Sequence, residues 1–145
     1  MRPLAMVLAV TLGLVALAAC SDDKASVEGA AKELVESLAA RDTVKVAQIM
    51  DTSEDEAART IAVSFAGRSQ EIRDLIISPG EKGCEELSAE QLANGVTAVC
   101  HVLADLQFND PQSGQWQDLR LAFVVELCGG RAIVSLDNAS YVPRC

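Results

Sequence analysis

Hydrophobic residues recur at three- and four-residue intervals through the first half of the chain, a spacing typical of helices that bury one face. This pattern predicts three helices, over residues 27–38, 42–50 and 53–67. Polar and charged residues fill the positions between, so each helix has one side suited to a core. The predicted inward faces are Val27, Ala30, Ala31, Leu34, Val35 and Leu38 in the first helix, Val46, Ile49 and Met50 in the second, and Ala57, Ala58, Ile61, Ala62 and Phe65 in the third.

Residues at the ends of these segments support the helix boundaries. Asp42 is a favourable N-cap for the second helix. Ser53 and Glu56 have the spacing of a capping box at the start of the third helix, and Gly67 marks its expected end. The helical half of the chain is therefore expected to stop near Gly67.

The second half alternates hydrophobic and polar residues, which is the pattern of strands with one buried face. We expect strands over residues 96–106, 119–127 and 132–136. Gly129 and Gly130, between the last two strands, are a two-residue hairpin signal. The pattern therefore predicts an antiparallel meander.

Two segments between these halves are less regular. Residues Ile72–Ser78 fit either a helix or a first strand, and Pro79 with Gly80 should end that element. Residues 88–93 fit one helical turn. Helices followed by a meander predict an α+β fold, with N-terminal helices packed on an antiparallel sheet in one domain, residues 27–145.

The start of the chain has a different composition. Arg2 precedes an uncharged run over residues 4–19 that ends in small residues, as in a secretory signal peptide over residues 1–19. Leu17-Ala18-Ala19-Cys20 resembles a bacterial lipobox. That resemblance implies cleavage between Ala19 and Cys20. It also implies a diacylglyceryl group on Cys20, with a further acyl chain such as palmitate in Gram-negative bacteria.

This predicted anchor defines the expected location. Residues 20–26 would be a short polar tether, and the lipid on Cys20 would hold the domain on a membrane of the bacterial cell envelope, outside the cytoplasm. Ser21 follows the cysteine, which favours the outer membrane in a Gram-negative host and otherwise the outer face of the plasma membrane. The chain has a net charge of −9, so nucleic acid is not expected as a partner.

The five cysteines become an even set once Cys20 is assigned to lipid. The remaining four predict two disulfides in an exported domain, with three pairings open; they are Cys84, Cys100, Cys128 and Cys145. A bond between the last two would require the tail after Leu136 to double back, which Pro143 would allow. No C-x-x-C pair is present and His101 is the single histidine, so no metal site is expected.

Four short motifs carry a family resemblance; they are Ser37–Asp42, Ile72–Ile77, Thr97–Cys100 and Val125–Ile133. Together they resemble the NTF2-like (cystatin-like) superfamily, in particular small exported lipoproteins of the DUF4878 type. Ala132 stands where the last motif usually has tryptophan. The resemblance implies a curved sheet wrapped around a long helix, with an apolar pocket between them in many members. Such folds include enzymes, binding modules and scaffolds, so fold alone does not assign a function.

His101 is the residue best suited to acid–base chemistry. It shares a strand face with Asp105, but the two lie about 13 Å apart at the rise of an extended chain, too far for direct contact. We therefore expect a surface histidine near an exposed aspartate and no catalytic residue. Glu54-Asp55-Glu56 should stabilise a helix N-terminus rather than bind a cation. Asn138-Ala139-Ser140 has glycosylation spacing, which we discount because the lipobox indicates a bacterium.

These observations favour a non-catalytic binding or accessory role without a cofactor, with an envelope protein or a small apolar ligand as partner. One alternative is an NTF2-like enzyme whose pocket uses acids such as Asp105 and Glu126, and another is a structural accessory of an envelope complex. We call the space between the curved sheet and the long helix the cone. An open cone with two converging polar side chains would favour the enzyme. A cone filled by Phe65, Leu121 and Phe123 would argue against it.

Overall fold

The computed structural model describes residues 15–65, 70–138 and 141–145, with side chains from residue 27 onward. The helices and strands in these ranges are α1 (Val15–Ala39), α2 (Thr43–Met50), α3 (Glu54–Val63), β1 (Ile72–Cys84), α4 (Ala89–Ala93), β2 (Val96–Asn109), β3 (Trp116–Cys128) and β4 (Arg131–Leu136). The predicted α+β class is confirmed. Residues 1–14 of the predicted signal peptide, Gly67, and two residues of the Asn138-Ala139-Ser140 motif lie outside the described residues.

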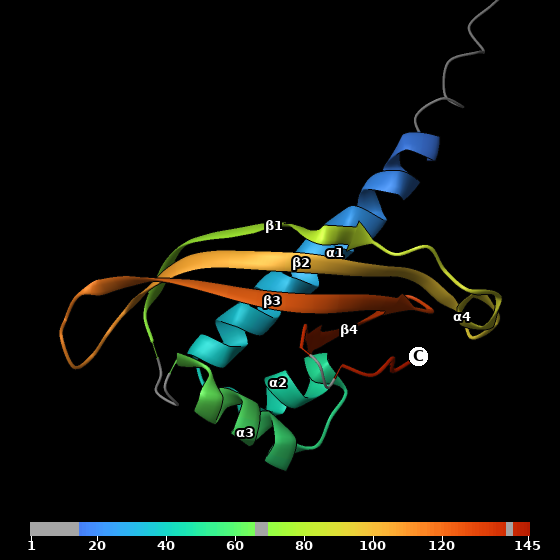
Figure 1. Ribbon diagram of the computed structural model, residues 1–145. Helices are drawn as coiled ribbons and strands as arrows, with labels where there is room; N and C mark the ends of the chain where they lie inside the picture. The colour runs from blue at the N-terminus through green and yellow to red at the C-terminus, as the bar shows by residue number, and fades with distance from the viewer. Residues whose placement is uncertain (1–14, 66–69, 139–140) are drawn as a thin grey trace, which may run out of the picture.

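The four strands of the described residues form one antiparallel sheet in the order β1-β2-β3-β4. α1 crosses one face of this sheet obliquely, and α2 and α3 lie near its C-terminal end (Figure 1). The N-terminal turns of α1 extend beyond the β1 edge of the sheet (Figure 1). We call the face that packs against the helices the inner face and the opposite one the outer face.

α1 begins earlier than the sequence pattern indicates. The helix is continuous from Val15 and includes residues 20–26, the predicted tether. Among the described residues, no helix is both long enough and apolar enough to cross a bilayer. The predicted inward face of α1 is confirmed from Val27 onward, where Leu34 and Val35 have no exposed surface.

The core between helices and sheet differs from the prediction in α3. Ser53 caps this helix as expected, its Oγ accepting a hydrogen bond from the Glu56 N–H. The buried positions are Ala57, Thr60 and Ile61, whereas Ala58 and Ala62, predicted to face inward, are exposed. The Thr60 hydroxyl can be buried because it donates a hydrogen bond to the Glu56 carbonyl.

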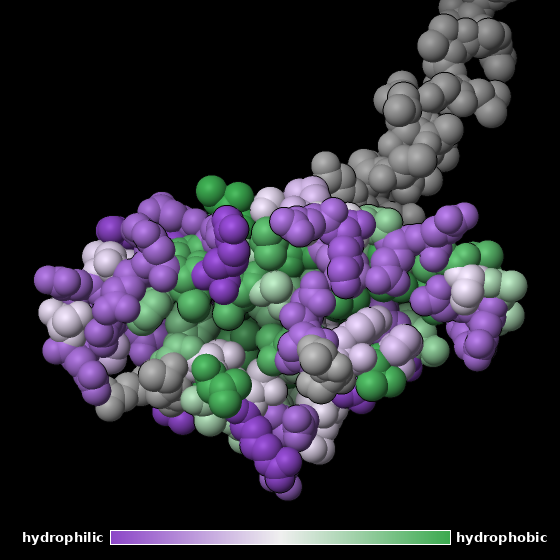
Figure 2. All heavy atoms as spheres, in the orientation of Figure 1, coloured by the Kyte–Doolittle hydropathy of each residue, from purple (hydrophilic) through white to green (hydrophobic). Residues whose placement is uncertain are grey.

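Aromatic and aliphatic side chains fill the centre of the cone. Phe123 is fully buried, Phe65 is 6% exposed, and Leu121 packs against the same cluster. Phe65 also contacts Phe108 edge to face. Hydrophobic residues are not confined to this core, because Figure 2 shows them reaching the surface between hydrophilic residues on the visible face.

The segment Ile72–Ser78, left open between helix and strand, is the first part of β1. Asp74 lies in the left-handed region with φ 55°, and the pairing with β2 shifts register between Arg73 and Ile76. This bulge breaks the two-residue alternation, which explains the ambiguous sequence pattern. The predicted stop at Pro79 and Gly80 is wrong, because an edge strand tolerates proline without losing a ladder hydrogen bond.

The hairpin between β3 and β4 is confirmed. Gly129 and Gly130 both have positive φ, at 57° and 80°, which a two-residue turn of this kind requires. Cys128 and Arg131 are the last paired residues on either side of it.

Candidate functional site

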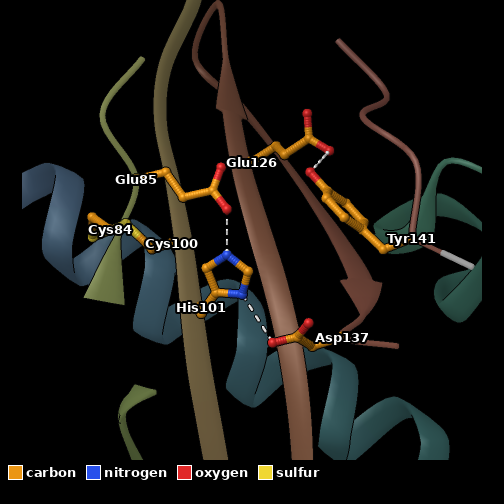
Figure 3. A network of polar contacts seen from close by, with 7 residues as sticks. All are labelled: Cys84, Glu85, Cys100, His101, Glu126, Asp137 and Tyr141. Carbon is orange, nitrogen blue, oxygen red and sulfur yellow. Dashed lines mark hydrogen bonds and ion pairs between the residues drawn. A yellow bond between two sulfur atoms is a disulfide. The ribbon is translucent and has the colours of Figure 1, made fainter. Parts of the chain in front are cut away.

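Successive residues of β2 face two different environments. Cys100 and Val102 belong to the core under the helices, on the inner face. Val99 packs in a smaller cluster with Val96 and Val124, on the outer face. His101 also points to the outer face, with α1 behind the sheet (Figure 3). The candidate site therefore has an inner and an outer part, and β2 is shared by both.

The inner part is a cavity of about 480 Å³, which we call the α1–β1 pocket. It lies between α1 and the paired strands β1 and β2. Its walls are almost entirely apolar, and its volume suits a small organic ligand. The lining residues are Val27, Glu28, Ile77, Ser78, Pro79, Gly83, Cys84, Ala98, Cys100, His101 and Val102.

Two features hold the β1 side of this pocket against β2. Cys84 and Cys100 are opposite each other in the strand register and form a disulfide. At Gly80 the two backbones approach so closely that a Cβ atom would lie 3.3 Å from the carbonyl carbon and oxygen of His101. Glycine therefore permits the close approach, and the disulfide fixes it.

The two disulfides resolve the open pairing. Cys84 bonds Cys100, and Cys128 bonds Cys145, whose Cα atoms are 6.2 Å apart. The other two pairings considered are wrong. The tail after Leu136 does double back, so that it covers the outer face.

On the outer face, His101 is buried between two carboxylates. Only 4% of its surface is exposed. Its Nε2 lies 2.6 Å from Oε1 of Glu85, directly after β1, and its Nδ1 lies 2.9 Å from Oδ2 of Asp137, directly after β4 (Figure 3). The predicted surface histidine is therefore wrong, because two connecting segments fold over the strand and enclose the ring.

This geometry favours the charged imidazolium, because only that form donates from both ring nitrogens. Burial alone would lower the pKa of His101, but the hydrogen bonds and charges of Glu85 and Asp137 raise it above 6.5. Neither ring nitrogen is free to accept a proton from a substrate. His101 thus acts as a charged link between β2 and the two segments that cover it.

A buried acid lies beside this link. Glu126 is 1% exposed and accepts hydrogen bonds from the Tyr141 hydroxyl at 2.8 Å and from the backbone N–H groups of Arg144 and Cys145 (Figure 3). Burial, followed by the bond to Glu126, raises the pKa of Tyr141 well above its usual range. Glu126 therefore fastens the C-terminal tail. We call these five residues, Glu85, His101, Glu126, Asp137 and Tyr141, the outer network.

One group of side chains in the described residues has the composition of a metal site. Ligand atoms of Glu126, Cys128 and Cys145 lie within 4.8 Å of one another. Both sulfur atoms are used in the disulfide, and metal binding by cysteine requires the thiolate. The Glu126 oxygens already accept hydrogen bonds from three donors, so this arrangement stabilises the tail and does not hold an ion.

Asp105 and Glu126, the acids considered for an enzyme pocket, do not line the α1–β1 pocket. Asp105 forms a bidentate ion pair with Arg120 of β3, at 2.6 and 3.0 Å, and makes no bond to His101. Arg120 lowers the pKa of Asp105. Both Asp105 and Glu126 are on the outer face, so neither enters the cone. Glu54-Asp55-Glu56 occupies the first turn of α3, as expected.

Glu85, Asp137 and Tyr141 were not predicted as partners. Strand alternation separates His101 from Cys100, but Glu85 and Asp137 lie in irregular segments where no periodicity indicates a direction. Glu85 and Asp137 are 16 and 36 residues from His101 along the chain, so no short-range sequence pattern connects them to it. The clue in the sequence was indirect, since a lone histidine among hydrophobic strand residues needs a polar partner when it is buried.

Comparison with known proteins assigns no family. The chain matches no protein-family model, no curated protein and no solved structure. The function has to be argued from the geometry of the pocket and the outer network.

Proposed function

We propose that this protein is a non-catalytic, lipid-anchored component of the bacterial cell envelope that binds a small apolar ligand in the α1–β1 pocket. The observation that carries the proposal is the cavity of about 480 Å³ with almost entirely apolar walls. Well-formed apolar cavities of this size are typical of ligand sites. The pocket lies between a long helix and an antiparallel sheet, as the resemblance to NTF2-like domains implies.

Several contacts argue against the alternative of an enzyme. Phe65 and Phe123 fill the centre of the cone. Both ring nitrogens of His101 are bonded to carboxylates, and Asp105 is neutralised by Arg120. Neither His101 nor Asp105 is therefore free to act as a general base.

The proposed anchor gives the pocket a location. The lipobox implies lipid on Cys20, and α1 runs without a break from there to Val27 in the pocket wall. Seven residues of helix span about 10 Å. The pocket would thus lie close to the membrane surface, where apolar ligands partition.

Photolabelling tests the binding function in native membranes. A photoreactive alkyl alcohol should label peptides around Ala98 or Ile77, because both residues line the pocket. Ala98→Trp would occupy the cavity and should reduce the labelling at least tenfold. Ala122→Trp, on the outer face of β3, is the matched control and should leave it unchanged. Equal labelling of both variants, measured by mass spectrometry of the peptides, would refute the proposal.

A further inference from the structure

The rim of the α1–β1 pocket carries an acid that forms no ion pair with the described side chains. Glu28 lines the pocket and is exposed. Among the side chains that the structure describes, the ion pairs of α1 join Lys32 to Glu36 and Glu33 to Lys45, and none involves Glu28. Its carboxylate therefore remains available at the edge of an apolar cavity.

No described cation balances this charge within the pocket. His101 is the other ionisable residue in the lining, and its ring is held by Glu85 and Asp137 on the outer face. Lys32, one turn further along α1, lies 3.9 Å from Glu36 instead. Lys82 and Arg120 line a different groove, of about 340 Å³, on the outer face.

We propose that the ligand of the α1–β1 pocket is a cationic amphiphile, with a hydrocarbon tail in the cavity and an ammonium group beside Glu28. This inference rests on the proposed binding function and specifies the chemistry of the ligand. The apolar walls accommodate the tail, and Glu28 supplies the complementary charge. The acidic chain, with a net charge of −9, adds attraction in the same direction.

The charge of the head group should change affinity measurably but modestly. Glu28 is exposed, so water and salt screen it. At about 4 Å in water, one pair of opposite charges corresponds to roughly fivefold in affinity. An anionic head group would be disfavoured by a similar factor, because no described basic side chain of the pocket compensates for Glu28.

The test uses the full lipidated protein in phosphatidylcholine vesicles. Three photoreactive alkyl probes of equal chain length are compared, ending in trimethylammonium, hydroxyl or carboxylate, and Ala98→Trp gives the background. The ammonium probe should label roughly fivefold more than the alcohol at low salt, and high salt should reduce this preference. Glu28→Gln should abolish the preference, and Glu28→Lys should shift it toward the carboxylate.

A matched variant distinguishes the effect of the Glu28 charge at the pocket from the effect of the net charge of the chain. Glu90→Gln, on α4 and outside the pocket lining, removes the same charge and should keep the ammonium preference. Equal labelling by ammonium and carboxylate probes, or a preference that survives Glu28→Gln, would overturn this inference alone. Labelling that never exceeds the Ala98→Trp background with any probe would overturn the proposed binding function as well.

Discussion

The two sides of β2 use neighbouring residues in opposite ways. On the inner side, Cys100 lines a cavity with apolar walls, and Glu28 at its rim forms no ion pair with the described side chains. On the outer side, His101 and Glu126 are charged groups enclosed by covering segments, and each has its hydrogen bonds satisfied. The inner side has an apolar cavity and little charge, whereas the outer side has paired charged groups beside a smaller groove of about 340 Å³.

This contrast separates the proposed ligand binding from stability. An apolar cavity lacks packing contacts, and such a cavity is retained at a cost in stability where a ligand can occupy it. Buried ionic groups gain little by themselves, but removing one partner leaves a charge without compensation. We therefore expect substitutions in the pocket to change ligand binding, and substitutions in the outer network to change the free energy of unfolding.

The largest effect is expected from the two disulfides, one on each side of the comparison. Replacing either pair by alanine should lower the free energy of unfolding by about 3 kcal/mol, because the closed loops of 16 and 17 residues are similar. Cys128→Ala with Cys145→Ala should lose more, since the tail that donates to Glu126 is also released. Urea unfolding measures both variants. An equal loss would show that the tail adds nothing to the outer side.

A smaller effect is expected from the tyrosine that fastens the tail. Tyr141→Phe removes only the hydroxyl that donates to the Glu126 carboxylate, and should cost about 1.5–3 kcal/mol. Val142→Ala, next to it and 65% exposed, is the control and should change stability little. Thermal unfolding distinguishes the two, and equal midpoints would contradict the role given to Glu126.

The smallest effect is a dependence of stability on pH. The fold raises the pKa of His101, so its charged link is fully stabilising below pH 6.5, the usual value for the unfolded histidine, and is lost as the pH rises through the folded value. The free energy of unfolding should therefore fall as the pH increases above 6.5. In His101→Gln this decline should disappear.

Two other titratable groups test whether His101 causes this decline in stability. Asp105 has a lowered pKa, so its contribution is lost as the pH falls, and Asp105→Asn should leave the decline above pH 6.5 intact. Tyr141 has a pKa well above its usual range and titrates only in strong alkali. A decline that persists in His101→Gln would show that another group is responsible.

Local patterns predicted the elements well where short-range physics decides them. Ser53 caps α3, Gly129 and Gly130 form the turn, and Leu34 faces the core, because each depends on neighbours within a few residues. The bulge at Asp74 hid a strand, since one added residue shifts every later side chain to the other face. Thr60 was missed because the predicted apolar face of α3 included only hydrophobic residues.

The sequence by itself determined the α+β class, the positions of most strands and the use of four cysteines in two disulfides. Only the tertiary structure decided which cysteines pair, where the cavity lies, and that His101 is buried between Glu85 and Asp137. The reason is that periodicity reports which face of one element is apolar. The meeting of irregular segments far apart in the chain depends on how the whole sheet and its tail are arranged.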